Sequence, residues 1–433
     1  MRKYFAFDRH RTTYRRETLA GFTTFVTMAY IIIVNPAILE VAGIPRGPST
    51  TATILAAAFG TLIMGLYAKR PFAIAPYMGE NAFVSFTVVK ALGFTWQEAL
   101  GAVFIAGIAF TVLTVLKIRS WLAEAIPCSL KYSFAVGIGL FITFIGLNET
   151  GIVTLGVPGA PVRLGNLSQP SVILALCGLL LTVLLMLRKV RGALVIGILM
   201  TTLLSFLFGI TKVPDAVIGL PPSPAPIFLQ LDISGALTPK FLPVVLTIFV
   251  MAFADTIGTL IGLSARAELL DENGNLPEIE KPMLADALAT TVAPLLGTTT
   301  TGAYVESAAG IEEGGRTGFA SLVTAGLFLL ALFFAPLCTV VPSHAYGVAL
   351  IVIGSFMISP LTQIVFDDPT ELLPAFLTIV LISFTFNIGV GITAGLLAWP
   401  LFKTLAGRAR EVPAGAWILA LISLSFFLFY PKG

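Results

Sequence analysis

Long apolar runs recur along almost the whole chain and predict membrane-spanning helices. They lie at 18–39, 50–67, 97–116, 130–147, 170–187, 192–210, 240–264, 281–297, 318–340, 345–359, 371–388, 391–405 and 415–430. A helix that crosses a bilayer needs about 20 apolar residues. Because the runs are continuous rather than alternating, they exclude a transmembrane β-barrel. The pattern predicts an all-α polytopic membrane protein.

Two further segments are apolar but interrupted. Segment 72–92 is broken by Pro76 and Gly79, and segment 298–313 opens with four threonines and contains a glutamate. Irregular backbone at membrane depth is tolerated only where protein buries it or where it lines a cavity. We therefore expect these segments, the third and the tenth, to be bent or half-spanning.

The two broken segments also indicate an internal repeat. Glu80 and Glu306 are 226 positions apart, and the same offset moves the first apolar run to 244–265, close to the run at 240–264. We expect two repeats, residues 1–225 and 226–433, with about 14 segments in all. Seven segments per repeat is an odd number, so the halves would insert in opposite orientations. Paired broken segments in inverted halves indicate a transporter site near the bilayer midplane.

Composition and charge agree with this class. The chain is 57% hydrophobic and 11% charged, with a net charge of +3, whereas soluble proteins are about a quarter charged. Basic residues form short clusters between the apolar runs, which is typical of topology determinants and not of a nucleic-acid surface. The three cysteines show neither metal spacing nor a disulfide framework.

The basic clusters predict the orientation. A charged lead of seventeen residues precedes the first run, so it is not a signal peptide and favours a cytoplasmic N-terminus in the cell membrane. Further basic clusters lie at Lys69 and Arg70, at Lys117 and Arg119, and at 188–191. They follow the second, fourth and sixth spans, which would place all of them on the same side of the membrane as the N-terminus. Loops 148–169 and 213–240 would lie outside, and the acidic insert 267–282 inside.

Asp255 is the first candidate for site chemistry, because an ionisable group inside an apolar span is costly. Helical spacing places Ala252, Asp255, Thr259 and Gly262 on one small, polar face. Gly258 and Gly262 form a small-xxx-small pair that favours close helix packing. The alternative is a carboxylate that only hydrogen-bonds a neighbouring helix.

Glu306 is the second candidate. It follows Tyr304 and Val305 in a stretch that resembles an extended strand leading into a helix. A carboxylate in the first turn is favoured by the helix dipole. Glu306 could bind a ligand or could serve only as a capping residue.

A third constellation contains Gly79, Glu80 and Asn81. The asparagine offers both a donor and an acceptor, and the glutamate could face the site, a neighbouring helix or water. Two facing half-helix starts with carboxylates, an amide and aromatic faces such as Tyr304 or Phe83 suit a neutral heterocycle. The same carboxylates, Asp255 and Glu306, could carry a coupling proton.

At these residues the chain resembles the nucleobase permeases of the xanthine/uracil/ascorbate superfamily (nucleobase–cation symporter 2), and in particular their adenine/guanine/hypoxanthine branch. The matching stretches are Thr23–Pro36, Ala75–Phe83, Phe253–Leu260, Glu306–Gly318 and Thr370–Phe376.

The resemblance implies a fourteen-segment inverted fold. Segments 1–4 and 8–11 would form a core that holds substrate, and segments 5–7 and 12–14 a gate domain. It also implies substrate contacts at Asp255, Glu306 and Asn81, with Tyr304 and Val305 beside them, and a possible homodimer. One departure is Glu80, since the position before the asparagine is commonly apolar in this branch.

The predicted function is therefore proton-coupled uptake of purine bases such as hypoxanthine, guanine and adenine. Uracil or xanthine selectivity, an anion exchanger on the same fold and a passive channel remain alternatives. Carboxylates at the helix starts would repel an anion. We find no H-E-x-x-H, G-x-S-x-G or P-loop pattern, so we expect neither an enzyme nor a metal or cofactor. Glu312, Glu313 and Arg316 are either a gate or a loop-facing charge cluster.

Overall fold

The computed structural model describes residues 1–433 except 117–124, 158–159, 215, 271–275 and 430–433. The predicted basic pair Lys117 and Arg119 lies outside the described residues. The first half comprises α1 (Tyr14–Met28), α2 (Ile31–Val41), α3 (Arg46–Ile63), the π-helical η1 (Met64–Ala68), β1 (Ile74–Pro76), α4 (Met78–Ala82), the π-helical η2 (Phe83–Ala91), α5 (Trp96–Val115), α7 (Cys128–Glu149), β2 (Val153–Val157), β3 (Ala160–Leu164), α8 (Pro170–Leu187) and α9 (Ala193–Leu207).

The second half of the chain is also mostly helical. It comprises α10 (Ile233–Ala236), α11 (Leu242–Arg266), α12 (Glu280–Leu296), β4 (Thr301–Ala303), α13 (Ser307–Glu312), α14 (Gly318–Ala331), η3 (Leu332–Phe334), α15 (Ala335–Thr339), α16 (Ser343–Phe356), η4 (Ser359–Gln363), α17 (Pro369–Phe384), α18 (Ile388–Leu405), η5 (Ala409–Glu411) and α19 (Ala414–Phe429). In each half, helices flank one short strand that leads into a short helix.

The helices confirm the predicted class. Within the described ranges, nine helices are long and apolar enough to cross a membrane, and three shorter apolar helices accompany them. The first predicted run is a helix pair, α1 and α2, with a turn at residues 29–30 between them. The fold is all-α apart from two antiparallel strand pairs, β1 with β4 and β2 with β3.

Polar side chains at the helix ends set several boundaries. The Thr13 hydroxyl caps α1, Thr95 and Glu98 form a capping box at the start of α5, and Asn387 caps α18. Each supplies an acceptor to a backbone N–H that has no partner within the helix. These caps fix where the three helices begin.

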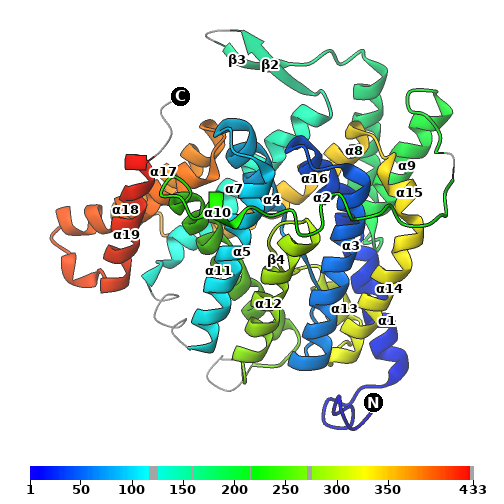
Figure 1. Cartoon of the computed structure of the whole chain (residues 1–433), viewed down its shortest axis with the longest axis horizontal. Helices are drawn as coiled ribbons and strands as arrows, with labels where there is room; N and C mark the ends of the chain where they lie inside the picture. The colour runs from blue at the N-terminus through cyan, green and yellow to red at the C-terminus, as the bar shows by residue number, and fades with distance from the viewer. Residues whose placement is uncertain (117–124, 158–159, 215, 271–275, 430–433) are drawn as a thin grey trace.

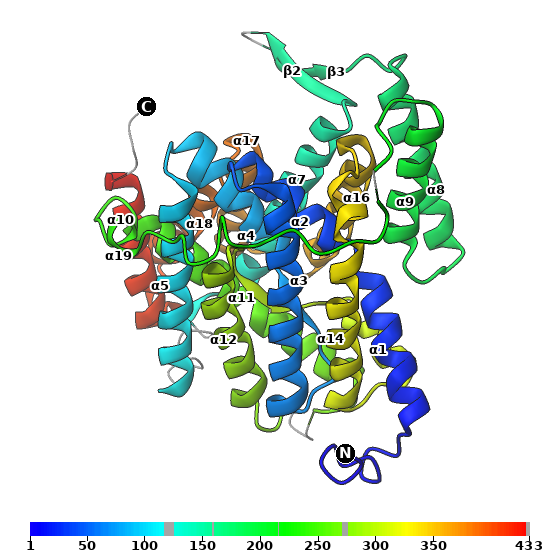
Figure 2. The same cartoon turned by 45° about the vertical axis from the view of Figure 1, so that its right-hand side comes forward.

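The helices pack in two groups. In one, α1 and α3 contact α14, while α5 contacts α11 and α12. In the other, α7 contacts α16 and α17, α8 contacts α9, and α17 contacts α18. Both groups contain helices from both halves, as Figures 1 and 2 show by their mixture of blue and yellow or of cyan and orange.

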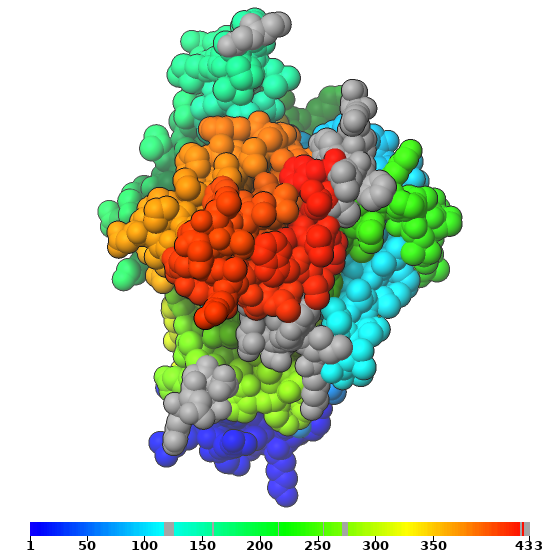
Figure 3. Space-filling view, turned by 90° about the vertical axis from the view of Figure 1, so that its left-hand side faces the viewer, coloured from blue at the N-terminus to red at the C-terminus, as the bar shows by residue number. Residues whose placement is uncertain are grey.

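The outer surface of the second group is apolar. Figure 3 shows α17, α18 and α19 in orange and red, lying together on one side of the molecule. Phe376, Phe384, Leu405 and Leu421 are exposed on these helices. Apolar side chains exposed on apolar helices suit contact with lipid acyl chains. The helix α19 follows α18 as an addition at the end of the second half.

The two ends of the molecule differ. The N-terminal lead lies at one end and the β2–β3 hairpin projects at the other (Figures 1 and 2). The predicted loop 148–169 therefore contains a strand pair that sequence patterning missed. Segment 213–240 crosses the surface as a strap, tied by Asp232 N–H to the Gln97 carbonyl at 2.9 Å and by Leu229 N–H to the Leu295 carbonyl at 2.9 Å.

Candidate functional site

The two broken segments meet as an antiparallel strand pair inside the first helix group. Ile74 faces Ala303, Ala75 faces Gly302, and Pro76 faces Thr301. All residues of both strands are buried. Pairing satisfies backbone groups that would otherwise be stranded away from water. Because the strands are antiparallel, α4 begins beyond one end of the pair and α13 begins beyond the other.

The sequence itself breaks the helix before β4. Helix α12 ends at Gly297, whose φ of 94° lies in the left-handed region that glycine adopts without a Cβ penalty. Residues 298–300 then run without regular structure into β4. The predicted bend of this segment is confirmed.

Two tyrosines mark the crossing. The rings of Tyr77 and Tyr304 stack with centroids 6.3 Å apart and planes at 13°. The Tyr304 hydroxyl donates to the Pro76 carbonyl at 2.5 Å, so this side chain ties one half to the other. Its hydroxyl is used within the protein, and its ring remains the group that could contact a ligand.

Glu306 lies at the start of α13 but does not cap it. Its side chain makes no capping hydrogen bond and instead accepts a hydrogen bond from the Tyr30 hydroxyl of the α1–α2 turn. The residue is half-buried, and the adjacent Val305 is 63% exposed. The interpretation of Glu306 as a capping residue is therefore wrong, and an accessible apolar side chain stands beside its carboxylate.

Asp255 lies on a partly open face of α11. Ala252 is buried and Asp255 and Thr259 are half-buried, whereas Gly258 and Gly262 are exposed. A Cβ added at either glycine would meet no atom within 4 Å. The prediction that these glycines pack closely against another helix is wrong, because no described residue covers this part of the face. The open surface leaves room beside Asp255.

Glu80 is the most unusual group of the site. It is 0% exposed in α4, and neither carboxylate oxygen has a hydrogen-bond partner among the described residues. It interacts electrostatically with Asp255 and Asp286. An isolated buried carboxylate is very costly unless it is neutralised, so Glu80 is a proton-bearing carboxyl in this conformation or a partner for a ligand.

Asp286 is a functional candidate that the sequence analysis missed. It is buried in α12 and accepts a hydrogen bond from the Thr256 hydroxyl of α11, the residue after Asp255. An aspartate within the apolar run 281–297 is the signal that could have identified it. Three carboxyls from α4, α11 and α12 are thus gathered in one region.

Asn81 is less available than expected. Its amide donates to the Asn35 side chain of α2, and Asn35 in turn donates to the hydroxyls of Thr53 at 2.7 Å and Thr298 at 3.0 Å. Only the Asn81 Oδ1 atom remains without a partner within the described part of the chain. The prediction of a free donor and acceptor holds for the acceptor alone. Asn35 itself, an asparagine within the apolar run 18–39, is the sequence feature that could have indicated this network.

Two other predicted contacts have structural roles. A Cβ at Gly79 would lie 2.8 Å from the Ile138 side chain of α7, so this glycine permits close packing of α4 on α7. Phe83 is fully buried in the apolar core and offers no face for stacking.

Within the described ranges, no group of three or more His, Cys, Asp or Glu side chains could hold a metal ion.

The charge cluster after α13 is paired. Glu312 and Arg266 form an ion pair at 2.9 Å, and Glu313 pairs with Arg191 of the α8–α9 loop. Arg316 lies 3.6 Å from Glu268. These pairs join α13 to α11 and to the second helix group, which fits both interpretations of the cluster, as surface ion pairs and as contacts that could open and close.

Three sets of known proteins resemble this chain. The Permease family model Xan_ur_permease matches residues 15–396. A putative permease of Methanocaldococcus jannaschii, MJ0326, is 48% identical over 99% of this chain and 98% of its own length. The guanine/hypoxanthine permease PbuG of Bacillus subtilis is 41% identical over 99% of this chain and 100% of its own length. The adenine permease AdeP of Escherichia coli is 37% identical over 99% of this chain and 96% of its own length.

Solved structures share the fold. The transmembrane domain of the cyanobacterial bicarbonate transporter BicA aligns with a TM-score of 0.66 at 16% identity, covering 88% of this chain and 97% of that domain. SLC26A9 aligns with a TM-score of 0.67 at 11% identity, covering 90% and 65%. At these identities the likeness concerns the fold alone. The family match and the curated relatives together establish that this chain belongs to the Xan_ur_permease family of membrane permeases, in the nucleobase permease branch.

Proposed function

We propose that this protein transports purine bases together with protons by alternating access. The observation that carries the proposal is the β1–β4 crossing. The strand β4 and the helix α13 that begins beside Glu306 both contact α11, the helix of Asp255, and both carboxylate residues are half-buried. The names of the relatives, which include guanine/hypoxanthine and adenine permeases, favour a purine substrate.

The substrate contacts follow from the groups present. In the proposed complex the Glu306 carboxylate accepts a ring N–H of the base while the Tyr30 hydroxyl holds the carboxylate in place. Asn81 Oδ1 accepts a second N–H. Val305 and the Tyr304 ring cover the apolar face of the base. A hydrogen bond to a charged acceptor contributes about 1.5–3 kcal/mol, so losing Glu306 would abolish useful affinity.

Proton coupling is assigned to Asp255 first. Glu306 has a hydroxyl donor that offsets its charge, whereas Asp255 interacts electrostatically with the carboxyl of Glu80, which also interacts with Asp286. Like charges in a poorly solvated site favour binding of a proton. In the proposed cycle, Asp255 takes up a proton from the open face of α11 and the base then binds at Glu306.

The two helix groups supply the moving parts of the proposed cycle. The group that contains α1–α5 and α11–α14 would be the core that holds substrate. The group that contains α7–α9 and α16–α18 would be the gate. Sliding of one group on the other would expose the site to each side of the membrane in turn.

The test is uptake of labelled hypoxanthine, guanine, adenine, xanthine and uracil by cells that lack their own nucleobase carriers. Wild type, Glu306→Gln and Asp255→Asn are compared, each with and without a protonophore. The matched control is Glu278→Gln, because Glu278 is an exposed glutamate outside the site, in an ion pair with Lys281.

We expect purine accumulation that is lost with the protonophore and in Glu306→Gln but retained in Glu278→Gln. Purine uptake that survives Glu306→Gln would refute the site assignment. Preferred uptake of uracil or xanthine would support the alternative selectivity. Absence of all base uptake, with protein present in the membrane, would refute the proposed function.

A further inference from the structure

The N-terminal lead is folded onto the end of the helix bundle. Phe5 and Phe7 are buried, and their rings pack against Phe319 at the start of α14 with centroids 6.0 and 5.8 Å apart. The Tyr4 hydroxyl donates to the Leu66 carbonyl at 2.7 Å. A segment that only determined topology would need its charges and not this packing. The lead is therefore built to hold particular residues in place.

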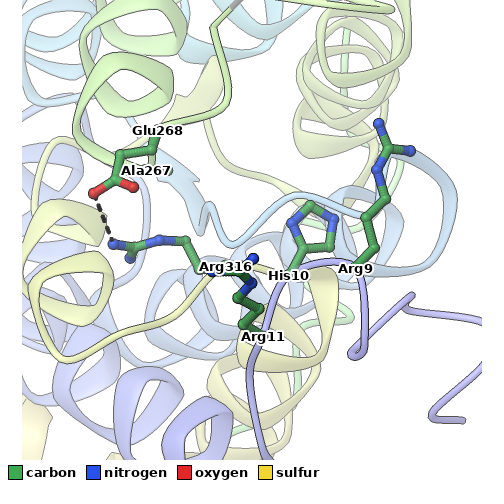
Figure 4. Close-up of a pocket in the computed structure, with 6 residues that line it drawn as sticks. All are labelled: Arg9, His10, Arg11, Ala267, Glu268 and Arg316. Carbon is green, nitrogen blue, oxygen red and sulfur yellow. Dashed lines mark ion pairs between the residues drawn. The ribbon is translucent and has the colours of Figure 1, made fainter.

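The residues that it holds line a pocket. Arg9, His10 and Arg11 of the lead face Ala267 and Glu268 after α11 and Arg316 before α14, around a cavity of about 220 Å³ (Figure 4). None of the site carboxylates described above contributes to it. The pocket joins the segment after the helix of Asp255 to the segment after the helix that begins beside Glu306.

The pocket carries an excess of positive charge. Three guanidinium groups face one carboxylate, that of Glu268, whose side chain is 83% exposed and lies 3.6 Å from Arg316. The Arg11 backbone N–H donates to the Asp8 carbonyl at 3.4 Å, but the side chains of Arg9 and Arg11 make no hydrogen bond or ion pair with any other residue that the structure describes. Figure 4 shows the Arg316–Glu268 pair on one side of the pocket, with His10 and Arg9 on the other.

His10 and Arg316 add hydrogen-bond donors to the pocket. Burial, together with Arg9, Arg70 and Arg316, lowers the pKa of His10, so its ring is neutral at pH 7 and can donate one hydrogen bond. Arg316 uses Nη1 on the carbonyls of Ile311 and Gly315, which fixes its guanidinium in position. A fixed guanidinium beside two unpaired ones suits an anion with several oxygen acceptors.

We propose that this pocket binds a phosphate group, carried either by a soluble nucleotide or by a lipid headgroup. Arginine forks match phosphate oxygens in pairs, and a neutral imidazole adds a donor. A bound phosphate would link the lead to the segments that follow the two site helices. It would thereby restrain their movement and slow transport. The proposal does not depend on which base the permease carries.

The test uses the full-length purified protein. One arm measures binding of GMP and of inorganic phosphate in detergent. The other measures binding to vesicles of phosphatidylcholine with and without phosphatidic acid. Variants Arg9→Gln and Arg11→Gln are compared with Arg15→Gln, an exposed arginine outside the pocket with the same loss of charge. Arg11→Lys keeps the charge but loses the paired geometry.

We expect Kd for one of the probes to rise about tenfold in Arg9→Gln and Arg11→Gln, the value of one charge-assisted hydrogen bond, and less than twofold in Arg15→Gln. Arg11→Lys should lie between them. Binding of GMP or phosphate would identify a soluble ligand, and binding of phosphatidic acid alone a lipid. Absence of binding by every probe, or equal loss in Arg15→Gln, would overturn the proposal.

Discussion

Replacing Glu80 by methionine should stabilise the protein. Glu80 is 0% exposed and both of its carboxylate oxygens lack hydrogen-bond partners among the described residues. A buried polar group without a partner costs about 1–3 kcal/mol. Methionine has a similar length and carries neither oxygen. We therefore expect the free energy of unfolding to rise by about 1–3 kcal/mol in Glu80→Met.

Glu17→Met provides a control with the opposite sign. Glu17 is also 0% exposed, but it accepts hydrogen bonds from the backbone N–H groups of Arg316 at 3.0 Å and Thr317 at 3.3 Å. The same substitution there leaves two buried donors without partners. At about 1–3 kcal/mol each, the loss should be roughly 2–6 kcal/mol. The two glutamates differ in their partners and not in their exposure.

The assay is thermal unfolding of the purified protein in one detergent at one pH. The unfolding entropy is about 2.1 cal/mol/K per residue, or roughly 0.9 kcal/mol/K for a chain of this length, so each 1 kcal/mol changes Tm by about 1 °C. We expect Tm to rise by about 1–3 °C in Glu80→Met and to fall in Glu17→Met. A lower Tm in Glu80→Met would refute the reasoning, because it would require a stabilising partner for the carboxyl.

Three further predictions concern the site and the opposite helix group. Tyr30→Phe removes the donor to Glu306 and should lower the initial rate of purine uptake about tenfold, whereas the exposed Tyr67→Phe should not change it. Gly302→Ala would place a Cβ 2.1 Å from the Tyr77 ring and should cost about 1–3 kcal/mol of stability. Gly262→Ala lies inside the helix α11 and meets no atom within 4 Å, so it should not lower Tm in the same thermal assay. Hydrogen bonds from Thr370 and Arg408 hold the pKa of Asp368 well below its usual range. The contribution of Asp368 to stability is therefore present above about pH 4 and is lost as the pH falls through the lowered pKa. Arg408→Gln should move the onset of acid unfolding to higher pH.

The sequence predicted the helices because lipid imposes a simple rule. Every spanning segment must be apolar for about 20 residues, so the runs were visible without any knowledge of their partners. The broken segments were visible for the opposite reason, since each combines a glutamate, which is rare at that depth, with residues that interrupt a helix. Glu80 and Glu306 were identified in this way.

The partners of these groups could not be predicted. Tyr30, Asn35 and Asp286 lie within ordinary apolar runs, and only the three-dimensional fold brings them to Glu306, Asn81 and Thr256. The small-xxx-small pair at Gly258 and Gly262 wrongly predicted close helix packing. Such spacing shows where another helix could approach, but it does not show that one is present. Side-chain periodicity describes one helix at a time, and the site is a property of several.

The strand pair at the crossing has an evolutionary consequence. Main-chain pairing holds Ile74–Pro76 against Thr301–Ala303, with the Tyr304 hydroxyl as an additional tie. Substitutions around this ladder can therefore change which solute is recognised without dismantling the scaffold that presents the recognition groups. The transmembrane domain of the bicarbonate transporter BicA, at 16% identity, shares this fold. A backbone-determined site of this kind allows a lineage to change its cargo one residue at a time.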